Sequence, residues 1–352
     1  MNQEGFSPAI ADVTRPGRPK KTTRARTLVT GGAGFVGSYV CRALAESGRE
    51  VCAFDIRPFS AEGRFVLGDL AKRVGHEQGS IDDEARVFDV VASFEPTEIV
   101  HMAMILDPGV LVRNRTTGFR VNVGGTISVL EAMRLFGVAR LVNFSSIGVL
   151  PPKLYEPIDT SHPFVLPRSG PGSDFYGAAK GASELFCFAY HQALGIDFRT
   201  IRPSAVYGLG MTHFPGPIKV MVEDSVQGKK VRFKTGGKHP RDYTHASDIA
   251  GLVLALLSAP DNSDRIFYGA TGRPLVSTTD VARMVMEIVP GADIKIGASL
   301  APAEKSVVAL RGQLSIQNAR RQLGWKPRYG NVRDGIAEYA STYREFLGST
   351  GA

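Results

Sequence analysis

A tyrosine and a lysine four residues apart are the pair in this chain best placed to do chemistry. They are Tyr176 and Lys180, in the segment Tyr-Gly-Ala-Ala-Lys. In a helix this spacing puts both side chains on one face. A phenol with a pKa of about 10 is a poor acid–base catalyst at neutral pH, but a neighbouring ammonium favours its phenolate form. The pair predicts proton transfer at a hydroxyl group, and an exposed helical pair is the alternative.

Three glycines spaced three residues apart indicate a dinucleotide site. They lie between a short apolar run at 27–30 and a helical pattern at 35–45. In such a turn Gly31 permits the tight bend, Gly34 lets the backbone approach a pyrophosphate, and Gly37 lets the helix pack closely on the strand.

The second predicted strand ends in a carboxylate, Asp55, which lies 18 residues after Gly37. A carboxylate at this place accepts both ribose hydroxyls of the adenosine and repels a 2′-phosphate, which favours NAD over NADP. Arg57 keeps NADP as a minority alternative, and a loop cap is the alternative role for Asp55.

A second acidic residue, Asp69, is a candidate for the adenine amino group. Together with Leu70 it follows a predicted third strand at 64–67, and a surface turn is the alternative.

The elements that position these residues alternate between strand and helix patterns. Strands are predicted at 27–30, 50–55, 64–67, 98–103, 140–145 and 198–202, and helices at 35–45, 81–93, 121–136, 176–194 and 250–257. This alternation predicts an α/β fold with a doubly wound, Rossmann-type parallel sheet and helices on both faces. Ligands of such sheets bind at the carboxyl ends of the strands.

The chain is expected to have three parts. Residues 1–26 form a flexible basic tail, 27–205 an NAD-binding Rossmann domain, and 206–346 a smaller C-terminal substrate-binding lobe that crosses back to the sheet around 240–270. The tail holds six basic and two acidic residues, half of the net charge of +8. We interpret it as a solvated arm, with a nucleic-acid arm or an organellar signal as alternatives.

Composition excludes several classes of protein. With 43% hydrophobic and 22% charged residues among 352, the chain is not disordered as a whole, and no apolar run reaches the ~18 residues of a membrane span. Its three cysteines, Cys41, Cys52 and Cys187, lack the spacing of a zinc site and suit a reducing compartment. We therefore expect a cytoplasmic protein with no metal, nucleic-acid partner or membrane partner.

Eight segments in order resemble the extended short-chain dehydrogenase/reductases, specifically the NAD-dependent epimerase/dehydratase family. They are TGGAGFVGS (30–38), HMA (101–103), NVGGT (122–126), FSS (144–146), YGAAK (176–180), RPSAVYG (202–208), RDYTHASD (241–248) and LGWKPRY (323–329). The resemblance spans about 27–346. It implies a large sheet that binds NAD, a C-terminal substrate lobe, a Ser/Thr-Tyr-Lys triad and a homodimer formed through a helix bundle.

Carried over by position, the resemblance implies that Tyr176 is the general acid/base, that Lys180 tunes it and binds the nicotinamide ribose, and that Ser146 holds the substrate oxygen. The full cofactor set is Gly31, Gly34, Phe35, Val36, Gly37, Asp55, Asp69, Leu70, Ala103, Tyr176, Lys180 and Pro203, and the substrate set is Ser146, Tyr207 and Arg241. Asn122 resembles the structural asparagine of a family helix, and an ordinary surface residue is the alternative.

Departures from the family pattern reduce the number of reactions to be considered. In dehydratases of the family this segment resembles Thr-Asp-Glu, which holds the acid and the base for water elimination. Here Ser146 is followed by Ile147 and Gly148, so we do not expect dehydration. Ala205 replaces an asparagine that contacts the phosphates in many nucleotide-sugar members.

Two arginines bear on the substrate. Arg241 matches an arginine that clamps the diphosphate, and an ion pair with Asp242 or Asp248 is its alternative role. Arg311 is only a loose counterpart of a second arginine.

Two enzymatic hypotheses follow, both for a carbohydrate-like small molecule. The first is a sugar epimerase, favoured by RDYTHASD and LGWKPRY. The second is a net NAD-dependent dehydrogenase of a sugar acid or a hydroxysteroid-like alcohol, favoured by Ala205 and Arg202-Pro203. A non-catalytic NAD-binding regulator is a third hypothesis, disfavoured because Tyr176 and Lys180 are both present. His213 and His245 are further candidates for the substrate pocket, whereas His101 is expected to be structural.

Overall fold

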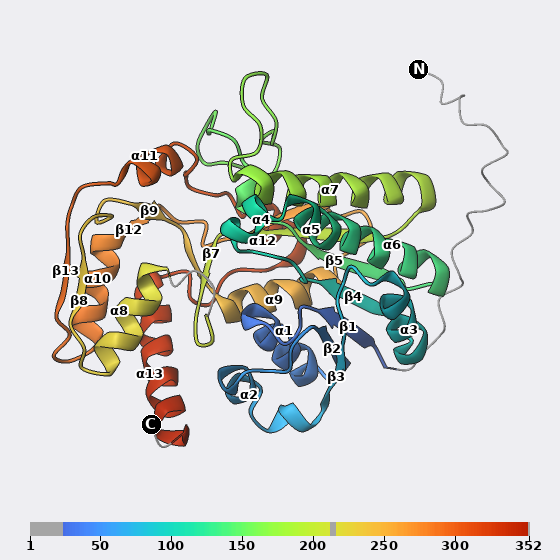
Figure 1. Cartoon of the computed structure of the whole chain (residues 1–352), viewed down its shortest axis with the longest axis horizontal. Helices are drawn as coiled ribbons and strands as arrows, with labels where there is room; N and C mark the ends of the chain where they lie inside the picture. The colour runs from blue at the N-terminus through green and yellow to red at the C-terminus, as the bar shows by residue number, and fades with distance from the viewer. Residues whose placement is uncertain (1–23, 212–215, 351–352) are drawn as a thin grey trace.

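A seven-stranded parallel sheet forms the centre of the protein. The computed structural model describes residues 24–211 and 216–350 (Figure 1). The strand order is β11-β6-β5-β4-β1-β2-β3, and every pairing is parallel. The strands are β1 (Arg26–Thr30), β2 (Glu50–Asp55), β3 (Val74–Gln78), β4 (Glu98–His101), β5 (Arg140–Phe144), β6 (Phe198–Pro203) and β11 (Ile266–Gly269). The predicted fold class is confirmed.

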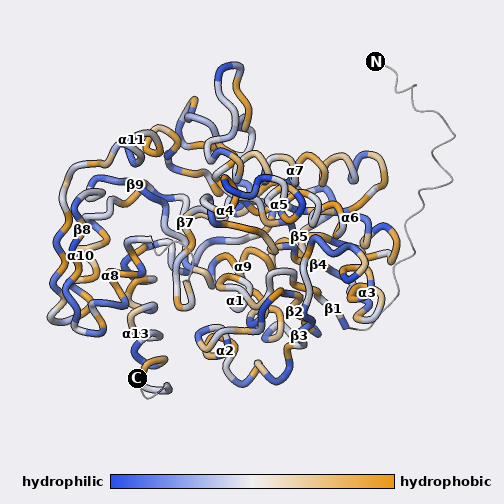
Figure 2. The backbone as a smooth tube through the Cα atoms, viewed as in Figure 1, coloured by the Kyte–Doolittle hydropathy of each residue, from blue (hydrophilic) through white to orange (hydrophobic). Residues whose placement is uncertain are grey.

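Helices cover both faces of the sheet, because side chains alternate in direction along each strand. Val29 packs in the core beneath α1 (Phe35–Glu46) and α9 (Ala246–Leu257). Its neighbour Leu28 packs in the second core, against α3 (Glu84–Phe94), α6 (Gly125–Phe136) and α7 (Asp174–Leu194). Figure 2 shows apolar residues gathered where α1, α9 and the strands meet.

The C-terminal lobe lies beside the carboxyl ends of the strands (Figure 1). Its elements are β7 (Ala205–Tyr207), α8 (Pro217–Val226), β8 (Val231–Phe233), β9 (Pro240–Arg241), β10 (Tyr243–His245), β12 (Val276–Ser277), α10 (Thr278–Ile288), β13 (Ile294–Ile296), α11 (Pro302–Val308) and α13 (Val332–Thr350). Helix α12 (Gln317–Leu323) instead packs on β11, where Asn318 donates to the Ile266 carbonyl at 2.9 Å. Between β10 and β12 the chain enters the Rossmann layers through α9 and β11. The domain limits themselves stay predictions.

The predicted strand at 64–67 is wrong, because this segment belongs to the helix α2 (Ala61–Leu67). Ser60 caps that helix by accepting the N–H of Gly63, and the helix buries Gly63, Val66 and Leu67, which have helical spacing. A short apolar run does not distinguish a strand from a helix by periodicity. The true third strand, β3, was missed because it lies at the sheet edge and buries only Val74.

Short helices complete the structure around the crevice. They are η2 (Gly68–Lys72), α4 (Pro108–Arg113), α5 (Arg115–Phe119), the π-helical turn η3 (Arg120–Gly124) and η4 (Ile147–Val149). Most of the predicted tail 1–26 lies outside the described residues, whose first strand begins at Arg26. Among the described residues, no helix combines the length and apolar character needed to cross a lipid bilayer.

Candidate active site

The glycine turn after β1 packs tightly against the backbone around it. Gly31 has φ +71°, and a Cβ there would lie 2.8 Å from the backbone nitrogen of Ala103. A Cβ on Gly37 would lie 2.3 Å from the Gly31 carbonyl oxygen. Helix α1 begins after Gly34 with no side chain capping its first N–H groups. These N–H groups, among them those of Phe35 and Val36, suit the pyrophosphate of NAD.

Asp55 supports the turn at the end of β2. Its two carboxylate oxygens accept the backbone N–H groups of Ala33 and Arg57, each at 3.2 Å. The loop-cap alternative is therefore present, yet each oxygen keeps a second lone pair for a ribose hydroxyl. Burial raises the pKa of Asp55, whereas the N–H groups of Arg57 and Ala33 lower it.

The adenine side of the crevice differs from the expectation. Asp69 and Leu70 follow a helix rather than a strand, and Asp69 is exposed on η2. The loop that does follow a third strand begins at Gly79, whose N–H donates to the Asp55 carbonyl at 3.0 Å. Sequence reasoning missed Gly79, Ser80 and Ile81 because it missed β3.

Tyr176 lies in the first turn of α7 beside Ser146. Burial raises the pKa of Tyr176, and a hydrogen bond with the Ser146 side chain lowers it. The phenol also contacts the Sδ of Met104 at 3.7 Å. Ser146 Oγ accepts the N–H of Gly148 at 2.9 Å, which fixes the hydroxyl at the end of β5.

Lys180 lies one helical turn after Tyr176 and is only 3% exposed. Its ammonium donates to the Phe144 carbonyl oxygen at 2.6 Å. Burial lowers the pKa of Lys180 to about 7, and the charge of Glu184 acts in the opposite direction. Burial thus brings the titration of Lys180 close to neutral pH.

Buried polar contacts attach this helix to the sheet. Asn122, in the π-helical turn, clamps the backbone of Ile105 through hydrogen bonds of 2.7 and 3.0 Å, and its carbonyl accepts from Ser183 of α7. His101 is hydrogen-bonded to Thr30 and Thr126 at 2.8 and 3.1 Å. Burial lowers the pKa of His101 to about 3, so the ring is neutral and structural, as expected.

Two arginines of the lobe lack partners in the part of the chain described. Arg241 makes no ion pair there, and its Nε is buried without a hydrogen bond. Burial lowers the pKa of Arg311 to about 10, with Arg241 as the second cause, so the two guanidinium groups repel each other. Such a pair suits an anion.

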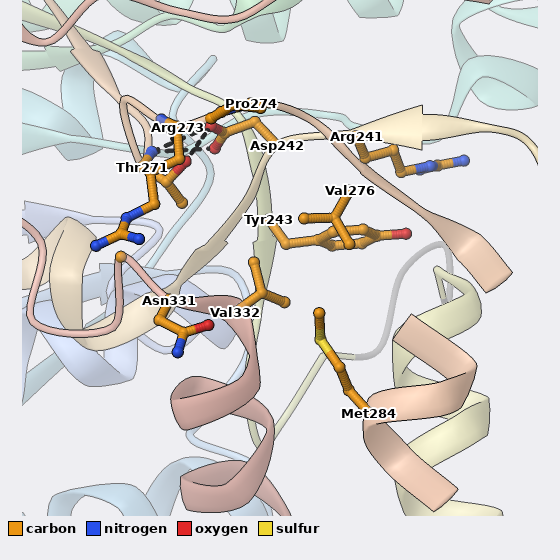
Figure 3. A pocket seen from close by; sticks show the side chains of 11 residues that line it. Arg241, Asp242, Tyr243, Thr271, Arg273, Pro274, Val276, Met284, Asn331 and Val332 are labelled. Atoms are coloured by element: carbon orange, nitrogen blue, oxygen red, sulfur yellow. Dashed lines mark hydrogen bonds between the residues drawn. The ribbon is translucent and has the colours of Figure 1, made fainter. Parts of the chain in front are cut away.

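The alternative ion pairs for Arg241 are not formed. Asp242 accepts from Ser204, Thr244 and Thr271. Asp248 accepts the N–H groups of residues 328 and 329. In Figure 3 the Arg241 side chain points away from Asp242.

Of the other candidates for the substrate pocket, Tyr207 and His245 lie in a buried aromatic cluster. Tyr207 is 0% exposed, and its ring packs against Tyr243, His245 and Tyr339. His245 caps α9 and lies 2.8 Å from Glu338. His213 lies outside the described residues. Two residues of the predicted cofactor set lie at the carboxyl ends of strands: Pro203 ends β6, and Ala103 follows β4 by two residues.

A cavity of about 160 Å³ lies in the lobe between β9, β12, α10 and the start of α13 (Figure 3). Tyr243, Val276, Met284 and Val332 line it, and Ser146, Tyr176 and Lys180 do not. Among the described residues, no cluster of three or more His, Cys, Asp or Glu could hold a metal ion.

The fold and this site define an NAD-binding α/β enzyme. Residues 27–268 match the model of the NAD dependent epimerase/dehydratase family, and the chain belongs to that family. The predicted family, enzyme class and NAD cofactor are confirmed.

The chain is similar over most of its length to proteins named for related reactions. It is 27% identical to a UDP-glucose 4-epimerase of Mycolicibacterium smegmatis, covering 91% of this chain and 98% of the relative. It is also 27% identical to a dTDP-glucose 4,6-dehydratase of Streptomyces niveus, covering 91% and 93%. A UDP-glucose 4-epimerase of Thermus thermophilus, solved with NAD, is 26% identical with a TM-score of 0.70, covering 91% and 99%.

Proposed function

We propose that this protein is an NAD-dependent epimerase of a nucleoside-diphosphate sugar. The observation that carries the substrate class is the pair Arg241 and Arg311, two guanidinium groups without ion pairs among the described residues. A diphosphate neutralises both through charge-assisted hydrogen bonds. The names of the full-length relatives agree with this substrate class.

The chain's own residues handle the proton and the oxygen. Tyr176, as phenolate beside the Lys180 ammonium, removes the proton of the reacting hydroxyl, and Ser146 donates a hydrogen bond to that oxygen. Gly31, Gly34 and Gly37 would hold NAD, which would supply a hydride acceptor and donor at the reacting carbon. Once the keto sugar has rotated, the hydride would return to the opposite face of that carbon, and Tyr176 returns the proton to the same oxygen.

The structure offers no acid–base pair for dehydration next to Ser146. Ile147 and Gly148 form η4 directly after it, and neither side chain carries a titratable group. Epimerisation needs only one acid–base group at the reacting oxygen, and Tyr176 supplies it.

A net dehydrogenase is the second candidate, favoured by Ala205. Its methyl group offers no hydrogen bond to a phosphate, and its backbone N–H is already used by the Asp242 carbonyl. One experiment separates the two reactions. We expect the purified protein, incubated with UDP-glucose, to form the C4 epimer with no accumulation of NADH absorbance. Stoichiometric NADH release would establish the dehydrogenase instead.

Substitution of the two arginines should weaken substrate binding. Each loses a charge-assisted hydrogen bond of about 1.5–3 kcal/mol, so Arg241→Gln and Arg311→Gln should each raise the KM for a nucleoside-diphosphate sugar about 10- to 100-fold. The kcat should change little, since neither residue touches the reacting carbon. Arg273→Gln is the matched control, because Arg273 lines the lobe cavity together with Arg241 but is not paired with Arg311. Equal effects at all three positions would refute the diphosphate assignment.

The same proposal includes a cytoplasmic homodimer formed through α6 and α7. Leu135 and Phe136 on α6 and Leu185 and Phe186 on α7 are exposed large apolar residues. A group of this kind on two packed helices is typical of a surface covered by a second copy. The three buried free cysteines support a reducing compartment.

A further inference from the structure

A buried ion pair lies next to the catalytic lysine and has no part in the steps above. Glu184 of α7 accepts two hydrogen bonds from the guanidinium of Arg202 on β6, at 2.9 and 2.7 Å. The two side chains are only 2% and 3% exposed. Ion pairs buried this deeply contribute little net stability, because desolvation offsets their attraction.

Glu184 lies one turn after Lys180 on α7, and this spacing places the two side chains on the same face of the helix. The carboxylate therefore has the Lys180 side chain on its own helix and the Arg202 guanidinium across on β6. The Lys180 ammonium donates only to the Phe144 carbonyl among the described residues. Burial lowers the pKa of Lys180, and the charge of Glu184 raises it. The carboxylate is thus shared between two cations.

Three other titratable groups lie around Lys180. Burial raises the pKa values of Tyr176 and Cys187 of α7 and lowers the pKa of His101 of β4. The remaining charge nearby belongs to the ion pair, with Tyr268 of β11 beside its guanidinium.

The pair is also closed off from solvent. The Phe164 ring lies 6.0 Å from the Arg202 guanidinium carbon, and Gly181 leaves it room, because a Cβ there would be 3.2 Å from the ring. The exclusion of water strengthens the charge interactions among Lys180, Glu184 and Arg202.

We propose that Glu184 is a positioning residue that keeps the Lys180 ammonium charged, and that Arg202 limits this effect by sharing the same carboxylate. The inference rests on the proposed role of Lys180. Removing Glu184 should lower the pKa of Lys180, and removing Arg202 should raise it. A purely structural ion pair predicts no such opposite shifts.

The direct test is the titration of Lys180 in the full chain, measured by NMR with 13Cε-labelled lysine and assigned with Lys180→Arg. In Glu184→Gln the lysine should titrate at least about 1 pH unit below the wild type, because the neighbouring anion is lost. In Arg202→Met it should titrate above the wild type, because the carboxylate then acts on Lys180 alone. Glu184→Asp, which keeps the charge, should restore most of the wild-type value.

A neutral pair guards against variants that do not fold. Glu184→Gln combined with Arg202→Gln leaves no unpaired buried charge, and Lys180 should still titrate below the wild type. Shifts in the same direction for the two single variants, or an unshifted lysine in the double variant, would overturn the proposal.

A second readout separates this inference from the proposed function. In each variant, the pH at which turnover falls on the alkaline side should shift in the same direction as the pKa of Lys180 measured by NMR. If the lysine shifts while this pH stays in place, the coupling stands and the catalytic role of Lys180 fails. If neither moves, the coupling itself is refuted.

Discussion

Tyr176→Phe is expected to lower turnover about 10²- to 10⁴-fold, the usual contribution of a positioned acid–base group. The substitution removes one oxygen and keeps the ring that packs against η4. A Cβ on Gly148 would lie 3.2 Å from Cδ1 of Tyr176, so the ring already packs closely on this turn without its hydroxyl. The affinity for NAD, measured by calorimetry, should therefore stay within about threefold of the wild type.

The control is a second tyrosine of the same helix. Tyr190 donates to Glu131 at 2.6 Å, far along α7 from the crevice, so Tyr190→Phe should leave turnover nearly unchanged. Retained activity in Tyr176→Phe would remove the basis for the acid–base assignment.

Gly37→Ala is expected to weaken NAD binding by about 100-fold or more, equivalent to ~2.7 kcal/mol. The new Cβ would lie 2.3 Å from the Gly31 carbonyl oxygen and 2.6 Å from that of Gly32, both backbone atoms that cannot move aside alone. The turn must therefore open, and the helix N-terminus no longer faces the pyrophosphate. Calorimetry with NAD measures the loss.

Gly348→Ala is the matched control, since it is also a helical glycine and nothing lies within 4 Å of its added Cβ. It should leave NAD binding unchanged and slightly raise the unfolding temperature, because alanine favours a helix over glycine. Normal NAD binding in Gly37→Ala would mean that the turn after β1 is not the cofactor cradle.

The motifs that could be predicted from the sequence are those formed by residues close together in the chain. The glycine turn, Asp55 and the Tyr176–Lys180 spacing are each recognisable from a few neighbouring residues, and the structure places them at one edge of the sheet. Strand β3 was not predictable in this way, because VGHEQ alternates poorly and is identified as a strand only by its pairing with β2.

Long-range packing also decided which candidates reach the crevice. Tyr207 has the expected motif, but the packing of α13 over β7 and β10 buries its ring. Arg311 gave little signal, since its relation to Arg241 arises from segments 70 residues apart. Glu184 and Arg202 could not be paired from sequence, because a helix and a strand meet only in the folded chain.

The position of β11 at the rim of the sheet has a consequence for dissecting the molecule. A fragment ending near residue 205 would leave the backbone of β6 unpaired along one side and would strip α9 from the apolar surface of α1. Open strands of this kind recruit other chains and aggregate. The nucleotide-binding half is therefore completed only after the ribosome has synthesised most of the chain, and the two halves are not interchangeable modules.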